Sequence, residues 1–134
     1  MSRPSVPLPD RAAAATLVAV GLAFGVPIPV VVDHLRRTGE LPMTPFGFRA
    51  YSGPFEALSP EAFEALVWAM AAVCAADVAA GGLTWRGDRR GPRLAAIATP
   101  AGLALGIGFA LPFYLAAIPI WSVLLLAGRR KRGP

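Results

Sequence analysis

The chain's longest uncharged stretch runs from Leu94 to Ala127 and reads LAAIATPAGLALGIGFALPFYLAAIPIWSVLLLA. A single straight helix of this length would measure roughly 51 Å, whereas the hydrocarbon core of a bilayer is about 30 Å thick. Two glycines and Pro112 cluster near its middle, and the residue before a proline avoids the helical conformation. We therefore predict a tight helical hairpin, with one arm over residues 94–109 and the other over residues 112–127.

Two further apolar stretches precede this one. Residues 12–32 contain no charge, and residues 62–83 contain only Glu64 and Asp77. Each stretch is long enough to cross a bilayer as one helix. The sequence thus predicts an all-α integral membrane protein, a four-helix bundle in a single domain. Its parts are spans at 12–32, 62–83, 94–109 and 112–127, an outer loop at 33–61, a cytoplasmic loop at 84–93 and a basic tail at 128–134.

Composition supports this class and excludes several others. Of the 134 residues, 55% are hydrophobic and only 16% are charged, whereas soluble domains carry about 25% charged residues. The formal net charge of +5 alone would suggest a nucleic-acid partner, but the apolar residues are gathered in uninterrupted stretches instead. A single cysteine excludes a disulfide scaffold, and we predict no nucleic-acid binding.

Basic residues distinguish four spans from three. Four spans place ten basic residues on the side of the N-terminus and three on the other, whereas three spans divide them six to seven. Because cytoplasmic loops carry the excess of Lys and Arg, four spans with both termini in the cytoplasm are predicted. The ten are Arg3, Arg11, Arg86, Arg89, Arg90, Arg93, Arg129, Arg130, Lys131 and Arg132, and the three are Arg36, Arg37 and Arg49.

The first apolar stretch could instead be a cleaved signal peptide, because two arginines precede it and Ala23-Phe24-Gly25 loosely resembles a cleavage site. A signal peptide has an apolar region of about 7–15 residues, however, and this stretch continues to Val32. An uncleaved helix is therefore favoured. Prolines and glycines in the outer loop leave little room for regular structure, and Ser59-Pro60-Glu61 has the pattern of a helix start.

Asp77 is the most informative polar residue, because an acid inside a span costs about 2.5 kcal/mol or more to insert and usually faces protein. Thr16, Thr99 and Ser122 lie at a similar distance from the cytoplasmic arginines of their helices. We predict an intramembrane polar cluster of these four residues. This cluster either holds the helices together through hydrogen bonds or, alternatively, binds a proton or a cation. Exposure of Asp77 at the cytoplasmic face is a third reading.

Small residues recur at four-residue spacing, which lets helix backbones approach closely. We predict packing faces formed by Gly21, Gly25, Ala72, Ala76, Gly102 and Gly106, within one chain or between copies. The prolines inside the spans predict kinks.

The remaining candidates for chemistry are isolated. His34 follows Asp33 at the outer end of the first span, but one histidine and one cysteine do not make a metal site, so no metal or cofactor is predicted. The tail residues Arg129, Arg130, Lys131 and Arg132 are predicted to bind anionic headgroups of the lipid bilayer.

These observations favour a small non-enzymatic membrane protein, a structural or accessory subunit with a membrane-protein partner or a second copy of itself. One alternative is a small transporter or ion-coupled carrier that uses Asp77. Another is a membrane enzyme that uses Asp33, His34 and Glu40 at the outer surface. Abundant Ala, Gly, Pro and Arg with a single Lys suggest a GC-rich bacterial coding sequence, so the plasma membrane in which we expect the chain is a bacterial inner membrane.

Overall fold

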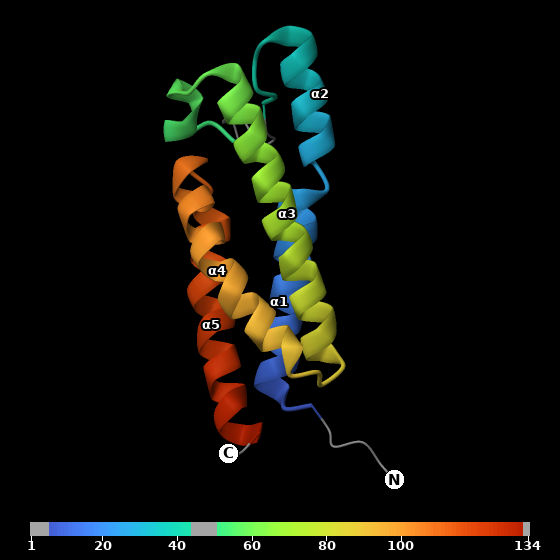
Figure 1. Cartoon of the computed structure of the whole chain (residues 1–134). Coiled ribbons are helices and arrows are strands. Elements are labelled where there is room, and N and C mark those ends of the chain that lie inside the picture. The colour runs from blue at the N-terminus through green and yellow to red at the C-terminus, as the bar shows by residue number, and fades with distance from the viewer. Residues whose placement is uncertain (1–5, 44–50, 133–134) are drawn as a thin grey trace.

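The computed structural model describes residues 6–43 and 51–132, and this part of the chain is predominantly helical. Figure 1 shows α1 and α2 following one another as a bent rod, with α3, α4 and α5 running alongside in alternating directions. The elements are α1 (Leu8–Gly25), α2 (Ile28–Thr38), η1 (Pro54–Ala57), α3 (Pro60–Trp85), α4 (Arg90–Gly108) and α5 (Pro112–Arg132). The start of α1, the α3–α4 turn and the end of α5 share one end of the bundle, called here the inner end. The outer end carries α2 and η1.

Three of the four rods are long and apolar enough to cross a membrane: residues 8–38 as one bent helix, α3, and residues 112–131. The remaining rod, α4, falls outside this group, because arginines in its first turn leave only residues 94–108 free of charge. It nevertheless packs along α3 and α5 as part of the bundle. The prediction of an all-α bundle of four rods is confirmed.

The first rod differs from the predicted span at both ends. It begins at Leu8, bends where α1 gives way to α2 around Pro27, and continues to Thr38. An ion pair across one turn supports the extension, with 2.9 Å from Arg37 Nε to Asp33 Oδ2. Gly39 then ends the helix at a φ of 75°, which glycine adopts without strain. Assigning residues 33–38 to a loop was therefore wrong.

The helix starts and turns of the other rods follow the sequence closely. The Ser59 Oγ accepts a hydrogen bond from the Ala62 N–H at 3.3 Å and caps α3 as predicted. At the opposite end of α3, the Asp88 carboxylate accepts a hydrogen bond from the Arg90 N–H at 2.9 Å and so supports the start of α4. Hydrogen bonds from Arg90 lower the pKa of Asp88 to about 2. This contribution to stability is present above the ordinary carboxyl pKa and is lost as the pH falls toward 2.

The predicted hairpin between α4 and α5 is present. The Leu111 N–H bonds the Gly106 carbonyl and the Ala110 N–H bonds the Ile107 carbonyl, which is the hydrogen-bond pattern of a Schellman motif. Ala110 takes the left-handed position at a φ of 51°, and Pro112 begins α5. Pro100 and Pro119 lie within continuous helices, so neither proline ends its helix.

The outer loop is more ordered where it meets this hairpin than its proline and glycine content predicts. Three rings, those of Tyr51, Phe55 and Phe63, surround the fully buried ring of Phe109 edge to face, with centroids 5.1–5.5 Å from it. Phe55 belongs to the single 3₁₀ turn η1, which sits over the end of α4 in Figure 1. This aromatic cap fastens the loop to the hairpin. The predicted loop residues Phe46, Phe48 and Arg49 lie outside the described part of the chain.

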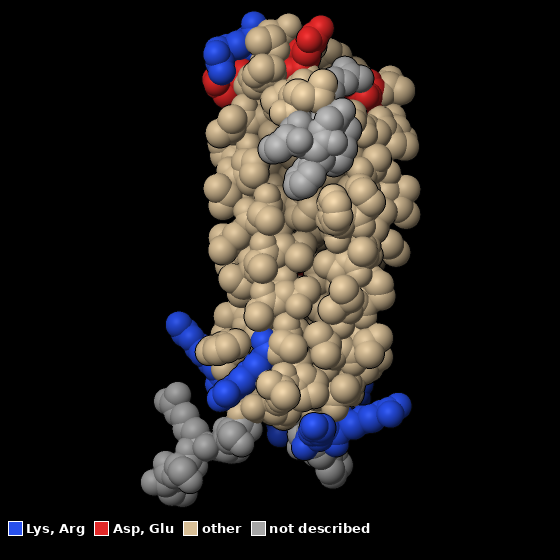
Figure 2. Space-filling view, turned by 180° about the vertical axis from the view of Figure 1, so that it is seen from behind, with Lys and Arg blue, Asp and Glu red and all other residues tan. Residues whose placement is uncertain are grey.

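On the face drawn in Figure 2, the charged side chains of the described residues lie at the two ends of the bundle. Figure 2 shows acidic and basic side chains at the outer end, basic ones at the inner end, and a broad uncharged belt between them on the face in view. Large apolar side chains are exposed along this middle section. They include Leu22, Val26, Val30, Trp68, Ile97, Leu103, Ile107, Phe113, Ile120, Val123 and Leu126. A water-exposed surface of this kind would be unusual for a soluble monomer.

Candidate functional site

Asp77 lies in the interior of the bundle and is bound to α5. Its side chain is fully buried on α3, and Tyr114, in the first turn of α5, is fully buried opposite it. The Tyr114 hydroxyl donates a hydrogen bond to Asp77 Oδ2 at 2.6 Å. A hydrogen bond to a charged or strongly polar partner in a low-dielectric interior is worth more than one in water. The pair therefore joins α3 to α5 through two residues that are 37 positions apart in the chain.

A glycine on α4 makes room for this pair. A Cβ placed on Gly102 would lie 2.6 Å from the Tyr114 hydroxyl oxygen, closer than side-chain carbons approach oxygen. Gly106, one turn further, faces Leu115 and Tyr114 in the same way. The two α4 glycines of the predicted packing face thus lie against α5 at the site itself.

Aromatic rings and one thiol complete the surroundings. The Tyr114 ring packs edge to face against Phe24 of α1 and Trp121 of α5, with centroids 5.6 Å and 5.8 Å away. Cys74 is buried on α3 one turn before Asp77. Asp77 Oδ1 has no hydrogen-bond partner within residues 6–43 and 51–132. The hydrogen-bonded pair of Asp77 and Tyr114, called here the Asp77–Tyr114 joint, is thus surrounded mainly by apolar groups.

Two of the three hydroxyls predicted beside Asp77, those of Thr16 and Thr99, make hydrogen bonds elsewhere. Thr16 donates to the Ala12 carbonyl of its own helix at 2.9 Å, and Thr99 donates to the Ala95 carbonyl at 2.6 Å. Thr99 also accepts a bond from the Trp121 indole at 3.3 Å. Ser122 shares with Thr99 the lining of a cavity of about 290 Å³ between α4 and α5. The similar positions of these residues along their helices predict a cluster of four polar side chains. The structure instead gives Asp77 a hydrogen-bond partner that this argument did not include, Tyr114.

A second buried tyrosine holds the bend of the first rod, and sequence reasoning missed it. The Tyr51 hydroxyl donates a hydrogen bond to the Phe24 carbonyl, just before the break at Pro27. Burial raises the pKa of Tyr51 above its ordinary value, so the hydroxyl remains a donor. A proline in a helix frees carbonyls of the preceding turn. That rule frees the carbonyls four residues before Pro27 and Pro29, those of Ala23 and Gly25. It therefore predicts neither Phe24 as the acceptor nor a loop residue 27 positions away as the donor.

Glycines bring α1 and α3 into backbone contact. A Cβ on Gly21 would lie 2.7 Å from the Cys74 carbonyl oxygen, and one on Gly25 would lie 2.9 Å from the Cys74 Cβ. The structure places these two predicted residues in the interface. Ala72 is exposed on α3 and Ala76 is only partly buried, so Ala72 does not pack within this chain, and its role between copies stays a prediction. Gly81, which the stripe did not include, fills the corresponding place on α3.

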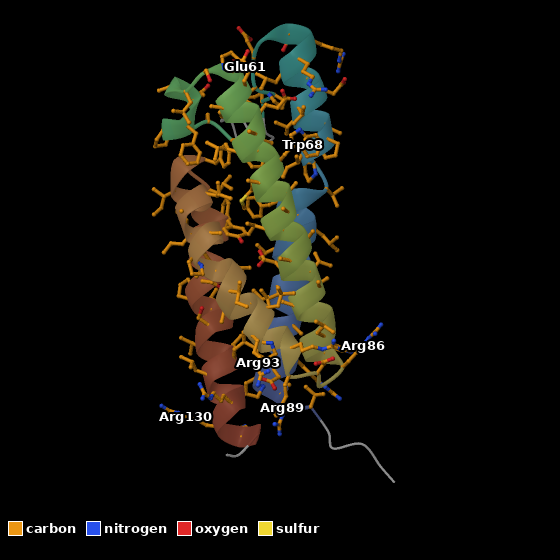
Figure 3. All side chains as sticks on the ribbon, in the orientation of Figure 1. Glu61, Trp68, Arg86, Arg89, Arg93 and Arg130 are labelled. Carbon is orange, nitrogen blue, oxygen red and sulfur yellow. The ribbon has the colours of Figure 1, made fainter. Side chains whose placement is uncertain are left out.

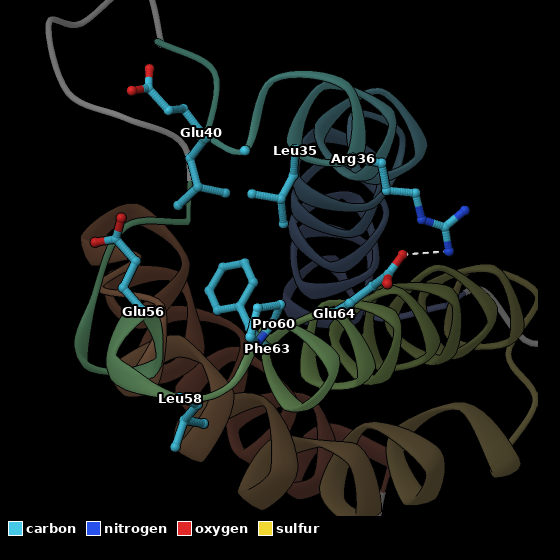
Figure 4. Close-up of a pocket in the computed structure, with 10 residues that line it drawn as sticks. Leu35, Arg36, Glu40, Glu56, Leu58, Pro60, Phe63 and Glu64 are labelled. Atoms are coloured by element: carbon cyan, nitrogen blue, oxygen red, sulfur yellow. Dashed lines mark ion pairs between the residues drawn. The ribbon is translucent and has the colours of Figure 1, made fainter.

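The outer end carries a cavity of about 320 Å³ between α2, η1 and α3 (Figure 4). Leu35, Leu58 and Phe63 contribute apolar lining, and on one side Arg36 forms an ion pair with Glu64 at 2.5 Å. Glu40 and Glu56 lie on the other side in Figure 4.

The residues of the predicted outer enzyme site are not gathered at this cavity. Glu40 lines it, whereas Asp33 and His34 are not among its lining residues. The Asp33 carboxylate is paired with Arg37, and His34 is partly buried on α2. Within the described residues, no group of three or more histidine, cysteine or carboxylate side chains could hold a metal ion.

Basic side chains gather at the inner end of the bundle. Figure 3 places Arg86 on one side of this end and Arg130 on the other, with Arg89 and Arg93 between them. The predicted anchor residues Arg129, Arg130 and Lys131 belong to the last turns of α5 and are exposed. The side chain of Arg132 lies outside the described part.

Comparison of this chain with models of protein families, with characterised proteins and with solved structures found no significant match in any of the three. Function is therefore inferred from the site and the surface.

Proposed function

We propose that the chain is a multi-pass integral membrane protein of a bacterial plasma membrane, with its inner end in the cytoplasm. The uncharged belt of exposed apolar side chains supports insertion into a bilayer. Exposing so many large apolar side chains to water is unfavourable, whereas contact with lipid or with another protein is favourable. The basic side chains at the inner end support the orientation, because cytoplasmic segments carry the excess of arginine and lysine. In this proposal α4 spans with the other rods, its short apolar segment extended by arginines that reach the interface.

Within the membrane, we propose a non-enzymatic structural or accessory role, in which the bundle presents its apolar belt to a partner protein. The observation that carries this role is the joint between Asp77 and Tyr114, which is fully buried and bonds α3 to α5. A polar pair of this kind holds membrane helices together. An acid that is enclosed on all sides is suited to fastening the bundle rather than to exchanging ions.

The second candidate is a proton- or cation-coupled carrier centred on Asp77. The observation that favours it is Asp77 Oδ1, which is buried without a hydrogen-bond partner among the described residues. An ionisable group inside a membrane bundle often marks an ion pathway.

Two substitutions distinguish fastening from transport. Tyr114→Phe removes the donor and leaves a buried carboxyl without its bond, so we expect a loss of about 1–3 kcal/mol in the free energy of unfolding. Asp77→Asn keeps an oxygen that accepts the Tyr114 hydrogen bond, so we expect stability within about 1 kcal/mol of the unaltered chain. Unfolding in mixed detergent, followed by circular dichroism, measures both.

The same variants are reconstituted into vesicles that contain a pH-sensitive dye. The structural role predicts equal proton flux for the unaltered chain, Asp77→Asn and protein-free vesicles. Flux above the protein-free level that Asp77→Asn abolishes would instead establish the carrier.

A further inference from the structure

A shallow groove runs along the outside of the bundle at its inner end, between α1 and α3. Its volume is about 500 Å³ and its surface is almost wholly apolar. We call it the inner groove. It is lined by Ala14, Ala15, Val18 and Ala19 of α1 and by Gly81, Gly82, Trp85 and Arg86 of α3.

Small residues create this groove. Gly81 brings the two helices together, because a Cβ there would lie 2.8 Å from the Ala14 carbonyl oxygen. The neighbouring Gly82 faces outward, and a Cβ on it would meet no atom within 4 Å. Ala15 and Ala19 are exposed on the other wall. The two helices are therefore in close contact at Gly81, and the groove is open at Gly82, which gives a trough along the helix pair.

The inner end of the groove carries two positive charges. Arg86 is an exposed lining residue, and the Arg11 guanidinium lies over the Trp85 ring at 5.8 Å from its centre. Neither arginine has a hydrogen bond or ion pair with a carboxylate within residues 6–43 and 51–132. Tryptophan is typical of the level where headgroups meet hydrocarbon. Arg11 and the far lining residue Ala19 are roughly 12 Å apart along α1, so the trough continues from that level into the hydrocarbon.

We propose that the inner groove binds one anionic phospholipid of the cytoplasmic leaflet, with an acyl chain in the trough and the phosphate between Arg11 and Arg86. This proposal rests on the membrane insertion proposed above. Charge complementarity selects the lipid over a second copy of the chain. In a two-fold dimer through this groove, Arg11 and Arg86 of both copies would meet at the same depth and repel.

The test uses the full chain, purified in mild detergent, stripped of lipid and titrated with phosphatidylglycerol or phosphatidylcholine under native mass spectrometry. We expect one phosphatidylglycerol molecule to bind more tightly than phosphatidylcholine. Arg86→Gln should weaken phosphatidylglycerol binding about fivefold, since each basic residue contributes about 1 kcal/mol. Arg89→Gln, at the same end but outside the groove, should change it less than about twofold.

Gly82→Leu tests the trough itself, because its side chain enters open space and occupies the place of about two methylene groups. We expect it to weaken phosphatidylglycerol binding about tenfold. Ala72→Leu adds the same side chain to the exposed face of α3 away from the groove and should leave binding unchanged. Equal binding of both lipids, or equal effects of Arg86→Gln and Arg89→Gln, would overturn the proposal. A dimer that Gly82→Leu dissociates would show that a second copy occupies the groove.

Extraction of the chain from native membranes by alkaline carbonate separates this outcome from a failure of the proposed function. A chain released by carbonate is not integral, and both proposals then fail. A chain that resists carbonate but shows no preference for phosphatidylglycerol contradicts the lipid site alone.

Discussion

Replacing Phe109 with alanine is expected to lower the free energy of unfolding by about 3–5 kcal/mol, the range for deleting a well-packed phenylalanine. Phe109 is fully buried at the α4–α5 turn, and the rings of Tyr51, Phe55 and Phe63 all pack on its edges or face. Its removal leaves a cavity that the backbone of the hairpin cannot close. The outer loop should then detach and become sensitive to protease while the inner half of the bundle stays folded.

Ile107→Ala is the matched control for this prediction. Ile107 lies two residues earlier on α4 and is more than half exposed. Its truncation should change stability by less than about 0.5 kcal/mol. Denaturant titration followed by circular dichroism compares the two variants, and limited proteolysis reports on the loop. Similar losses for both variants would contradict the aromatic cap.

Gly81→Leu is expected to cost about 3 kcal/mol or more, at or above the upper end of the usual range for overpacking. A Cβ at Gly81 meets the Ala14 carbonyl oxygen at 2.8 Å and the Leu17 Cβ at 3.2 Å. Because these atoms belong to the helix backbone and its first side-chain carbon, α1 and α3 must move apart to relieve the contact. The chain should lose its compact form in detergent.

Gly82→Leu makes the same chemical change one position along the same helix. A Cβ there meets nothing within 4 Å, so its stability should equal or slightly exceed that of the unaltered chain, since leucine favours helix more than glycine. Melting temperature and elution volume on size exclusion distinguish the pair. Equal behaviour of the two leucine variants would show that α1 and α3 do not meet at Gly81.

The rods of this fold follow from the sequence because hydrophobic runs and helix-ending residues are local signals. The hairpin around Pro112 and the start of α3 at Ser59 lie where the pattern predicts them. The sequence pattern does not predict the extension of α2 beyond residue 32, because the charges from Asp33 onward end the apolar stretch without ending the helix. Asp33 and Arg37 instead pair on one face of it.

The joint between Asp77 and Tyr114 could be predicted only in part. The cost of a buried acid identified Asp77 as a residue in need of a polar partner. The choice of partner depends on which helices adjoin and on how α4 leaves room at Gly102, and neither is a local property. The depth of a residue along its helix likewise does not say which face it occupies. Thr16 is therefore predicted at the same depth in the membrane as Asp77, although its hydroxyl donates a hydrogen bond to the Ala12 carbonyl of its own helix.

Four rods are proposed to cross the membrane with both termini in the cytoplasm. Among the described rods, α4 is the decisive one, because it is the one that does not qualify as a membrane span by length and composition alone. Reporters that are active on only one side of the membrane are fused after Pro42, after Asp88 and after Pro134. We expect the first reporter to be active outside and the other two to be active in the cytoplasm. An external signal after Pro134, with the other two as predicted, would mean that α4 and α5 do not both cross and would contradict the four-span bundle.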